Sequence, residues 1–446
     1  MTERRPSARE TIALVADDST FTELAYPARD CGPNAPLDWQ GYDDSRARGA
    51  ERTGEEESVV CGTASVAGTR AVLLAFEFGF LGGSLGQRTG DRLESAYTHA
   101  RAHRLPVVPL VATGGSRMQE GMFALTQLQR VARQSTLTRE AGLAQIAVLR
   151  DPTTGGGWAT LGAGADVTLA LPGAQVGFAG SRVRPPDADP AAYTAQAQVA
   201  AGAVDAVVRP EELREELGRW LRLLSGPPAQ EAPVPRALGA PDLPATGWEA
   251  VRRARAPQRP HAGAYLDAYF TTRVTISGDR CGGTDPEGIR CGFGSHDGRT
   301  VAYAAQLGTA TRPAGYRTAT RLLRLADRLG IPVLTLVDTP GAANDAEAER
   351  QGVGAAIADL FAAVAGARVP ITTLVIGEGG SGGALALAAP GNTWATPDSY
   401  FSVIAPELAA AILKRGVDEV EATADQLRIR PQDLVELGVI RGVVQG

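Results

Sequence analysis

Glycines cluster at one point of the chain, where a hydrophobic run meets a run of helix-forming residues. Residues 371–376, rich in Ile, Thr, Leu and Val, are typical of a buried strand, and residues 384–387 favour a helix. Between them, GEGGSGG at 377–383 contains five glycines. Glycine is needed where the backbone takes positive φ or lies against a ligand, and N–H groups at a helix start point at anions. This turn could therefore bind a phosphate, a pyrophosphate or a developing oxyanion.

The same turn also matches two catalytic motifs. Residues 379–383 read G-x-S-x-G, the nucleophile elbow of serine hydrolases, with Ser381 at the centre. That class needs a histidine after the serine in chain order, and no histidine follows His296, which argues against it. From Gly377 the segment also reads G-x-G-x-x-G, the dinucleotide fingerprint, with Asp398 placed for a ribose hydroxyl. That fingerprint alone is unspecific, and the other half of the chain lacks it.

A second set of glycines lies in the first half of the chain, at a constant distance in sequence from the first set. Three separated matches share this spacing: Pro106 with Pro332, Gly115 with Gly341, and the pair 156–157 with the pair 382–383. We therefore predict a duplicated domain, each copy with two glycine turns at the carboxyl ends of parallel strands. Two such turns facing one crevice offer several N–H groups to a thioester carbonyl. They would stabilise an oxyanion or enolate without a side-chain catalyst.

Strands and helices alternate around these turns in both halves. In the first half, we expect strands at 58–64, 70–77, 107–113 and 146–150 and helices at 91–103 and 118–140. In the second half, we expect a helix at 316–329 and strands at 331–341 and 371–376. This order predicts an α/β fold with βαβ crossovers and mostly parallel sheets.

Changes in composition divide the chain and limit its function. We expect a loose tail at 1–20, a first domain at 21–225, an extended Pro- and Ala-rich linker at 226–256 and a second domain at 257–446. A net charge of -6 with scattered basic residues argues against a nucleic-acid partner. The sequence has neither a membrane-length apolar run nor an apolar leader, so we expect a cytoplasmic protein. The four cysteines form no C-x-x-C pair, so no metal site is predicted.

Longer motifs surround the glycine turns. The first half carries FLGGSLG at 80–86, TGGSRMQEG at 113–121, DPTTGG at 151–156 and GFAGSRV at 177–183. The second carries PQRP at 257–260, GYR at 315–317, VDTPGA at 337–342, GEGGSGGALAL at 377–387 and SVIAPE at 402–407. Together these motifs resemble the carboxyltransferase component of acetyl-CoA carboxylase, with a β-type half before an α-type half. The resemblance implies two tandem crotonase-like domains of ββα repeats related by duplication.

The resemblance also implies a reaction and a set of site residues. A carboxyl group would pass from carboxybiotin, held by a separate carrier protein, to the α-carbon of a short acyl-CoA such as acetyl- or propionyl-CoA. By matching motifs, the amides of Gly114 and Gly115 would hold the thioester oxyanion, and those of Gly382, Gly383 and Ala384 the biotin oxygen. The residues expected to bind substrate around them, with the arginines as candidates for coenzyme phosphates, are Gly82, Gly83, Ser84, Arg117, Gly155, Gly156, Phe178, Arg182, Arg317, Gly341, Gly379 and Gly380.

Biotin is expected on another chain. Family carriers attach it to a lysine between methionines, whereas Lys414, the only lysine, lies in ILKRG. The resemblance therefore implies a biotin carboxyl carrier protein charged by a separate biotin carboxylase. It also implies a homo-oligomer, either a dimer or a hexamer, whose active site lies between subunits.

Two departures from the family pattern qualify the resemblance. The β-type half lacks the usual four-cysteine ribbon, so no zinc is expected. Ala343, Asn344 and Asp345 replace the usual Tyr-Pro-Gly after VDTPGA, which leaves the choice of acyl-CoA open. A biotin-independent acyl-CoA decarboxylase and a degenerate scaffold subunit stay as alternatives.

Overall fold

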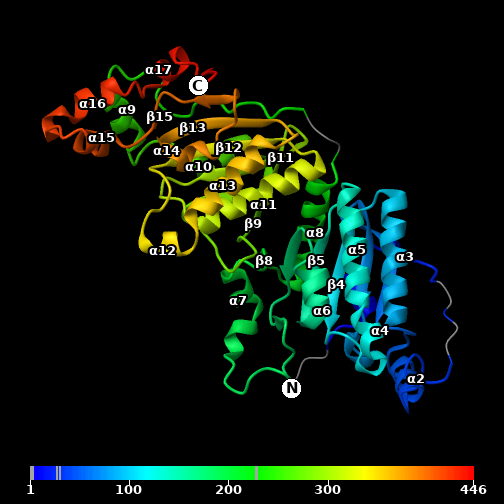
Figure 1. Cartoon of the computed structure of the whole chain (residues 1–446). Coiled ribbons are helices and arrows are strands. Elements are labelled where there is room, and N and C mark those ends of the chain that lie inside the picture. The colour runs from blue at the N-terminus through cyan, green and yellow to red at the C-terminus, as the bar shows by residue number, and fades with distance from the viewer. Residues whose placement is uncertain (1–4, 27–28, 30–31, 227–229) are drawn as a thin grey trace. The chain divides into compact units, whose positions relative to one another are not determined.

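The computed structural model describes residues 5–26, 29, 32–226 and 230–446 (Figure 1). The chain divides into two compact units, Met1–Ser225 and Gly226–Gly446, each with its own eight-stranded sheet. Within the described residues, no helix combines the length and the apolar character that a bilayer crossing requires.

The sheet of the first unit has the strand order β1-β2-β3-β4-β5-β6-β8, and β7 pairs with β5. The pairs β1–β2 and β2–β3 are antiparallel and the later pairs are parallel, as the alternation of strands and helices predicts. The strands are β1 Thr22–Glu23, β2 Val59–Val66, β3 Thr69–Phe76, β4 Val107–Thr113, β5 Ile146–Thr154, β6 Val167–Ala170, β7 Val176–Gly177 and β8 Ala206–Val207.

Helices α3 and α5 of the first unit lie side by side (Figure 1). Their buried side chains belong to the hydrophobic core of this unit. The helices are α1 Ala8–Val15, α2 Tyr42–Thr53, α3 Gln87–His103, α4 Gly121–Leu125, α5 Gln127–Glu140, α6 Gly155–Gly157, α7 Ala195–Ala200 and α8 Pro210–Leu224. Short 3₁₀ or π turns are η1 Leu81–Gly83, η2 Met118–Glu120, η3 Trp158–Gly162 and η4 Pro190–Tyr193.

The second unit repeats this sheet, with the order β16-β14-β13-β12-β11-β10-β9 and β15 paired to β13. Its strands are β9 Thr272–Ile276, β10 Ile289–His296, β11 Arg299–Gln306, β12 Val333–Thr339, β13 Ile371–Gly380, β14 Thr393–Ala395, β15 Tyr400–Ser402 and β16 Gly442–Val443. Its helices are α9 Gly247–Ala254, α10 Ala262–Tyr269, α11 Pro313–Leu329, α12 Ala346–Arg350, α13 Val353–Ala365, α14 Ser381–Leu385, α15 Pro406–Ile412, α16 Val420–Gln426 and α17 Pro431–Glu436, with the 3₁₀ turn η5 Val417–Glu419.

The two units are copies of one fold. Helices α3 and α11 have equal length, and each end of α11 follows the same end of α3 by the spacing that relates the glycines. The ends of β12 follow those of β4 by the same spacing. Parallel pairing continues through β5 in one unit and β13 in the other. The α/β duplication predicted from the glycine spacing is therefore confirmed.

The N-terminal segment is more ordered than the sequence suggested. Helix α1 begins with a capping box in which Ser7 and Glu10 bond to each other's backbone, and Ile12 and Val15 are buried. The prediction of a loose tail at 1–20 is therefore wrong for this helix, while residues 1–4 lie outside the described part. The spacing of Ala8, Ile12 and Val15 was the signal that the sequence reading missed.

Two further boundaries differ from the predictions. Helix α9 falls inside the segment assigned to an extended linker, and Thr246 caps it by accepting a bond from the N–H of Glu249. The buried face of α9 packs with Tyr400, Ala424 and other residues in a small separate core, which stabilises it. The single helix expected at 118–140 is instead split into η2, α4 and α5.

Candidate active site

The glycine turns lie at the carboxyl ends of neighbouring parallel strands in each unit. In the first unit, Thr113 at the end of β4 pairs with Thr153 of β5, after a shift in register. In the second, Thr339 at the end of β12 pairs with Gly379 of β13, after the same shift. The number of residues between Thr113 and Thr339 is the same as the number between Thr153 and Gly379. The turns therefore leave the two sheets at equivalent points.

The first turn of each unit requires glycine. Gly115 has φ +108° and Gly341 has φ +142°, and side chains rarely tolerate such values. The N–H of each glycine donates to a threonine hydroxyl two residues earlier, at 3.1 Å from Gly115 to Thr113 and 3.2 Å from Gly341 to Thr339. The same hydrogen bond therefore holds both turns.

The predicted glycines of each unit come together. In the first unit, a Cβ added at Gly155 would lie 3.2 Å from Cα of Gly115, and the N–H of Gly114 donates to the carbonyl of Gly82 at 2.9 Å. A Cβ at Gly83 would meet the carbonyl oxygen of Ala112. The loops 80–86, 113–117 and 153–157 therefore pack backbone against backbone.

The second unit brings its own predicted residues together in the same way. A Cβ at Gly380 would meet the carbonyl of Pro340, and one at Gly383 would lie 2.5 Å from the backbone nitrogen of Ala342. Gly379 packs against the ring of Phe401. Ala384 follows directly in α14 and is fully buried.

Two of the predicted donors are already occupied. The N–H of Gly114 is bonded to Gly82, and that of Gly115 to Thr113. This corrects the prediction that these two amides are free to hold a thioester oxyanion. These N–H groups are not free because they form the hydrogen bonds that fix the conformation of the turn. The motif match had assigned the same groups to a ligand.

Other N–H groups of the turns stay available. Gly156 and Gly157 are the second and third residues of α6, and Gly382 and Gly383 hold the same positions in α14, so no intrahelical acceptor exists for their N–H groups. Within the described part of the chain, none of these four N–H groups donates to a protein acceptor. Gly156, Gly157 and Gly383 are buried, and because a buried N–H without an acceptor is costly, this pattern favours an acceptor from outside the chain.

The space in front of the second turn is open. A Cβ added at Gly382 would have no atom within 4 Å outside its own chain neighbours. By contrast, the carbonyl of Gly383 on the other side of the turn accepts hydrogen bonds from Gln306 and Tyr316, each at 3.2 Å. Neither side chain was predicted from the sequence, although Tyr316 lies in the GYR motif, because their partner is a backbone atom far along the chain.

Arg117 does not lie where a coenzyme phosphate could reach it. Its side chain is 1% exposed and forms an ion pair with Glu57, which is equally buried. It also donates to the carbonyl of Ser84 at 2.8 Å and to the hydroxyl of Tyr42 at 3.1 Å. The phosphate prediction for Arg117 is therefore wrong: this arginine joins the loops behind the first glycine turn.

The charge of this pair is stabilised by mutual contact. Burial alone acts to raise the pKa of Glu57, but the charge and hydrogen bonds of Arg117 outweigh it and lower the pKa to about 2. Ser84, predicted to contact substrate, accepts a bond from Arg117 at 3.1 Å through its hydroxyl. Ser84 is thus part of the same support.

The other two predicted arginines differ from each other. Arg317 donates to Asp279 at 2.7 Å and to the carbonyl of Gln351 at 3.0 Å, so its guanidinium already has acceptors within the chain. Arg182 is exposed and follows Phe178, whose side chain is also exposed. Of the three arginines, Arg182 is the one whose surroundings leave room for a coenzyme phosphate.

A buried ion pair lies behind the second glycine turn. Arg259 of the PQRP motif donates to both carboxylate oxygens of Asp338 at 2.7 Å, and Asp338 is fully buried. The same carboxylate accepts from the N–H of Glu378 at 3.2 Å. The side chain of Glu378 in turn accepts from Arg255 at 2.7 Å and from Tyr400 at 2.8 Å. These bonds fix the end of β12 against the end of β13.

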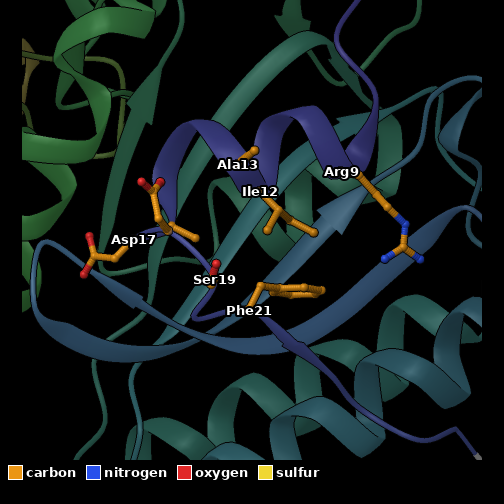
Figure 2. Close-up of a pocket in the computed structure, with 8 residues that line it drawn as sticks. Arg9, Ile12, Ala13, Asp17, Ser19 and Phe21 are labelled. Carbon is orange, nitrogen blue, oxygen red and sulfur yellow. The ribbon is translucent and has the colours of Figure 1, made fainter.

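Neither Ser381 nor the cavity beside α1 indicates a second chemistry. Ser381 has φ +57°, as a turn residue between β13 and α14, and among the described residues no hydrogen bond joins it to a histidine. The cavity has a volume of about 500 Å³ and is lined by residues such as Arg9, Ile12 and Phe21 (Figure 2). None of the glycine turns lines this cavity.

Two family models match the chain. Residues 36–204 match the model described as carboxyl transferase domain. Residues 244–446 match the model described as acetyl co-enzyme A carboxylase carboxyltransferase-like. Each match covers the glycine turns of one unit.

Whole-chain relatives agree with these matches. A Saccharopolyspora erythraea protein named acetyl-coenzyme A carboxylase carboxyl transferase subunits beta/alpha is 39% identical, over 92% of this chain and 76% of that protein. A protein of the same name from Salinispora arenicola is 38% identical, over 99% of this chain and 82% of its own length. Among solved structures, transcarboxylase 12S, crystallised as a hexamer with hydrolysed methylmalonyl-coenzyme A, superposes with a TM-score of 0.80 at 20% identity, over 99% of this chain and 87% of that one. This structural likeness shows the shared fold.

Proposed function

The chain belongs to the family of acetyl-CoA carboxylase carboxyltransferases, with β-type and α-type halves in one polypeptide, and from this we propose that it carboxylates a short acyl-CoA with carboxybiotin. We propose 21–225 as the β-type domain and 257–446 as the α-type domain. The observation that carries the proposal is the pair of equivalent glycine turns, each with N–H groups that no acceptor of the described chain takes. One oxyanion stabiliser is thereby available for each of the two substrates.

The proposed reaction makes two oxygens negative. When bound, carboxybiotin supplies CO2 and then a base for the α-proton of the acyl-CoA, whose enolate attacks that CO2. The C–N bond of the donor breaks, a C–C bond forms at the α-carbon, and the proton ends on the ureido nitrogen. The chain's own task is to orient both substrates and to place N–H donors at the thioester oxygen and the ureido oxygen.

We assign the donors by the geometry of the two turns. Gly382 and Gly383 fit the ureido oxygen, because their N–H groups are free and the space beside Gly382 is open. At the thioester oxygen, Gly156 and Gly157 take the place that the motif match assigned to Gly114 and Gly115. The latter two glycines instead fix the neighbouring turn.

The proposal includes partner proteins. Lys414 is the only lysine and lacks a methionine on either side, so biotin would arrive on a separate carrier protein charged by a separate ATP-dependent biotin carboxylase. We propose that the chain works with them in the cytoplasm. Acetyl-CoA would give malonyl-CoA, a precursor of fatty acids and polyketides, and propionyl-CoA would give the methylmalonyl ester.

A single assay separates this function from its alternatives. Purified protein is incubated with malonyl-CoA or methylmalonyl-CoA, with and without free biotin, while CO2 and carboxybiotin are measured. The proposal expects carboxybiotin to form and acyl-CoA to accumulate only when biotin is present. If CO2 is released at the same rate with and without biotin, the protein is instead a decarboxylase. If the folded protein binds no acyl-CoA in calorimetry, it is a scaffold.

A further inference from the structure

The carbonyl of Gly383 is held from behind by two side chains of other elements. Nε2 of Gln306 at the end of β11 and the hydroxyl of Tyr316 on α11 each donate to it at 3.2 Å. A regular helix would supply the N–H of Leu387 for this carbonyl, but that N–H donates to Ala384. The two side chains therefore replace a backbone donor that α14 does not provide.

Both side chains are placed at a cost. Gln306 and Tyr316 are fully buried, and within the described residues Oε1 of Gln306 has no hydrogen-bond partner. An unpaired buried acceptor destabilises a fold, and an apolar residue would avoid this loss. Burial also raises the pKa of Tyr316, so its hydroxyl stays protonated and remains a donor. Retention of two such side chains favours a functional reason for the two donors.

The first unit lacks the same support. At the end of β3 and on α3, the positions equivalent to Gln306 and Tyr316 are occupied by Phe76 and Gly90. No side chain among the described residues donates to the carbonyl of Gly157, the counterpart of Gly383, and the methyl groups of Thr113 and Leu85 lie nearest to that glycine. The duplicated fold therefore does not require polar side chains at this place. They belong to the second turn alone.

We propose that Gln306 and Tyr316 are positioning residues for carboxyl transfer, an inference that rests on the proposed function. A trans peptide is planar, so fixing the carbonyl of Gly383 also fixes the N–H of Ala384 in the opposite direction, toward the front of the turn. It equally restrains Gly383, whose backbone would otherwise sample many conformations. The N–H of Gly383, one of the two donors assigned to the ureido oxygen, is thereby held in place before the reaction, as oxyanion stabilisation requires.

The test compares two tyrosines of equal burial in the same unit. Tyr316→Phe removes the hydroxyl behind the turn, whereas Tyr303→Phe removes one that donates to the carbonyl of Val274 at 3.1 Å, in the antiparallel part of the sheet. In the malonyl-CoA and free-biotin assay, we expect Tyr316→Phe to lower kcat about 10-fold, less than the 10²- to 10³-fold loss for removal of a direct donor. KM for malonyl-CoA should stay unchanged. Tyr303→Phe should keep the kcat of the unmodified protein, and both variants should keep a similar Tm.

A second variant separates positioning from stability. Gln306→Leu removes the donor and the unpaired oxygen together, so we expect kcat to fall while Tm stays equal or rises. An unchanged kcat in Tyr316→Phe, or equal losses in Tyr316→Phe and Tyr303→Phe, would overturn the positioning role while leaving the proposed function intact. No biotin-dependent activity in the unmodified protein would overturn the proposed function and the positioning role with it.

Discussion

At the residue scale, the backbone and the arginines of this chain have separate roles. The N–H groups of Gly156, Gly157, Gly382 and Gly383 have no acceptor within the described part of the chain, while Arg117 is buried in an ion pair that holds loops. The sequence located the glycines because glycine has few other uses at a strand-to-helix turn. The prediction for Arg117 was wrong because its partner carboxylate, Glu57, lies 60 residues earlier, and no local sequence pattern indicates this ion pair.

The open space beside Gly382 allows a clean test of the second turn. Gly382→Val adds a side chain beside the N–H groups that lack a protein acceptor, and its Cβ would have no neighbouring atom within 4 Å, so we expect at least a 10²-fold loss of kcat with an unchanged fold. Gly354→Val on α13 is the matched control, since a Cβ there is equally unobstructed. Steady-state transfer assays and circular dichroism measure the two effects. Full activity of Gly382→Val would remove this turn from the site.

The Arg117–Glu57 pair predicts a response to acid. The pKa of Glu57 is lowered from 4.5 to about 2, so its contribution to stability is present above the unfolded value and is lost as the pH falls from about 4.5 to 2. Glu57→Gln should therefore flatten the fall of Tm over this range. At pH 7 it should cost about 1–3 kcal/mol of unfolding free energy, because Arg117 loses the nearer of its two buried carboxylate partners and keeps only Glu120.

Glu56 supplies the control for this acid response. Its side chain is 90% exposed, so Glu56→Gln should change neither the unfolding free energy nor its pH dependence. Thermal melts between pH 2 and 5 and urea titrations at pH 7 provide the data. A Glu57→Gln variant with the same pH slope as the unmodified protein would contradict the ion-pair account.

At the element scale, apolar runs predicted the central strands well and the element ends less well. The strand at 107–113 was predicted with its observed bounds, since every residue of β4 is buried and the run is apolar throughout. Helix α3 begins at Gln87, before the predicted start at 91. Its first turn was not predicted because it contains polar and glycine residues, which are buried under loops. Burial of polar residues by distant loops is the information that a local pattern does not contain.

Helix α1 provides a test of order near the N-terminus. Ile12 is 4% exposed and α1 contacts β2, β3 and α8, so we expect Ile12→Ala to destabilise the first unit by about 2–4 kcal/mol. Ala13→Ser on the exposed side of the same helix should be nearly neutral. Denaturant unfolding of the full chain distinguishes the two. If both substitutions leave the unfolding free energy unchanged, the prediction of a loose tail would be correct after all.

At the scale of the whole molecule, the constant spacing between matching glycines predicted the duplication, and the structure extends it to strand register and helix ends. What the spacing could not predict is where the copies differ. The first turn rests on apolar side chains, and the second on Gln306 and Tyr316. Such divergence is consistent with two turns that serve different oxygens in one reaction, since each copy is free to change its support without changing the fold.

The surface of the second unit predicts association. Leu408, Ile412 and Leu413 on and after α15 are more than half exposed, and Val417 is 91% exposed. Solvent contact with so many apolar side chains on neighbouring residues favours a protein interface. We expect the protein to sediment as an oligomer, and Ile412→Glu to raise the Kd of association at least 30-fold, because an unpaired charge in an interface costs about 2–5 kcal/mol.

The transfer assay then decides whether association matters for activity. If the active site lies between subunits, the specific activity of Ile412→Glu should fall on dilution in parallel with the loss of oligomer. Thr272→Glu, at an exposed position on β9, adds the same single negative charge away from α15 and should change neither quantity. Sedimentation velocity and activity measured on the same dilution series test this. A fully active monomer would show that one chain holds a complete site, because donors from both units would then have to serve both substrates within a single polypeptide.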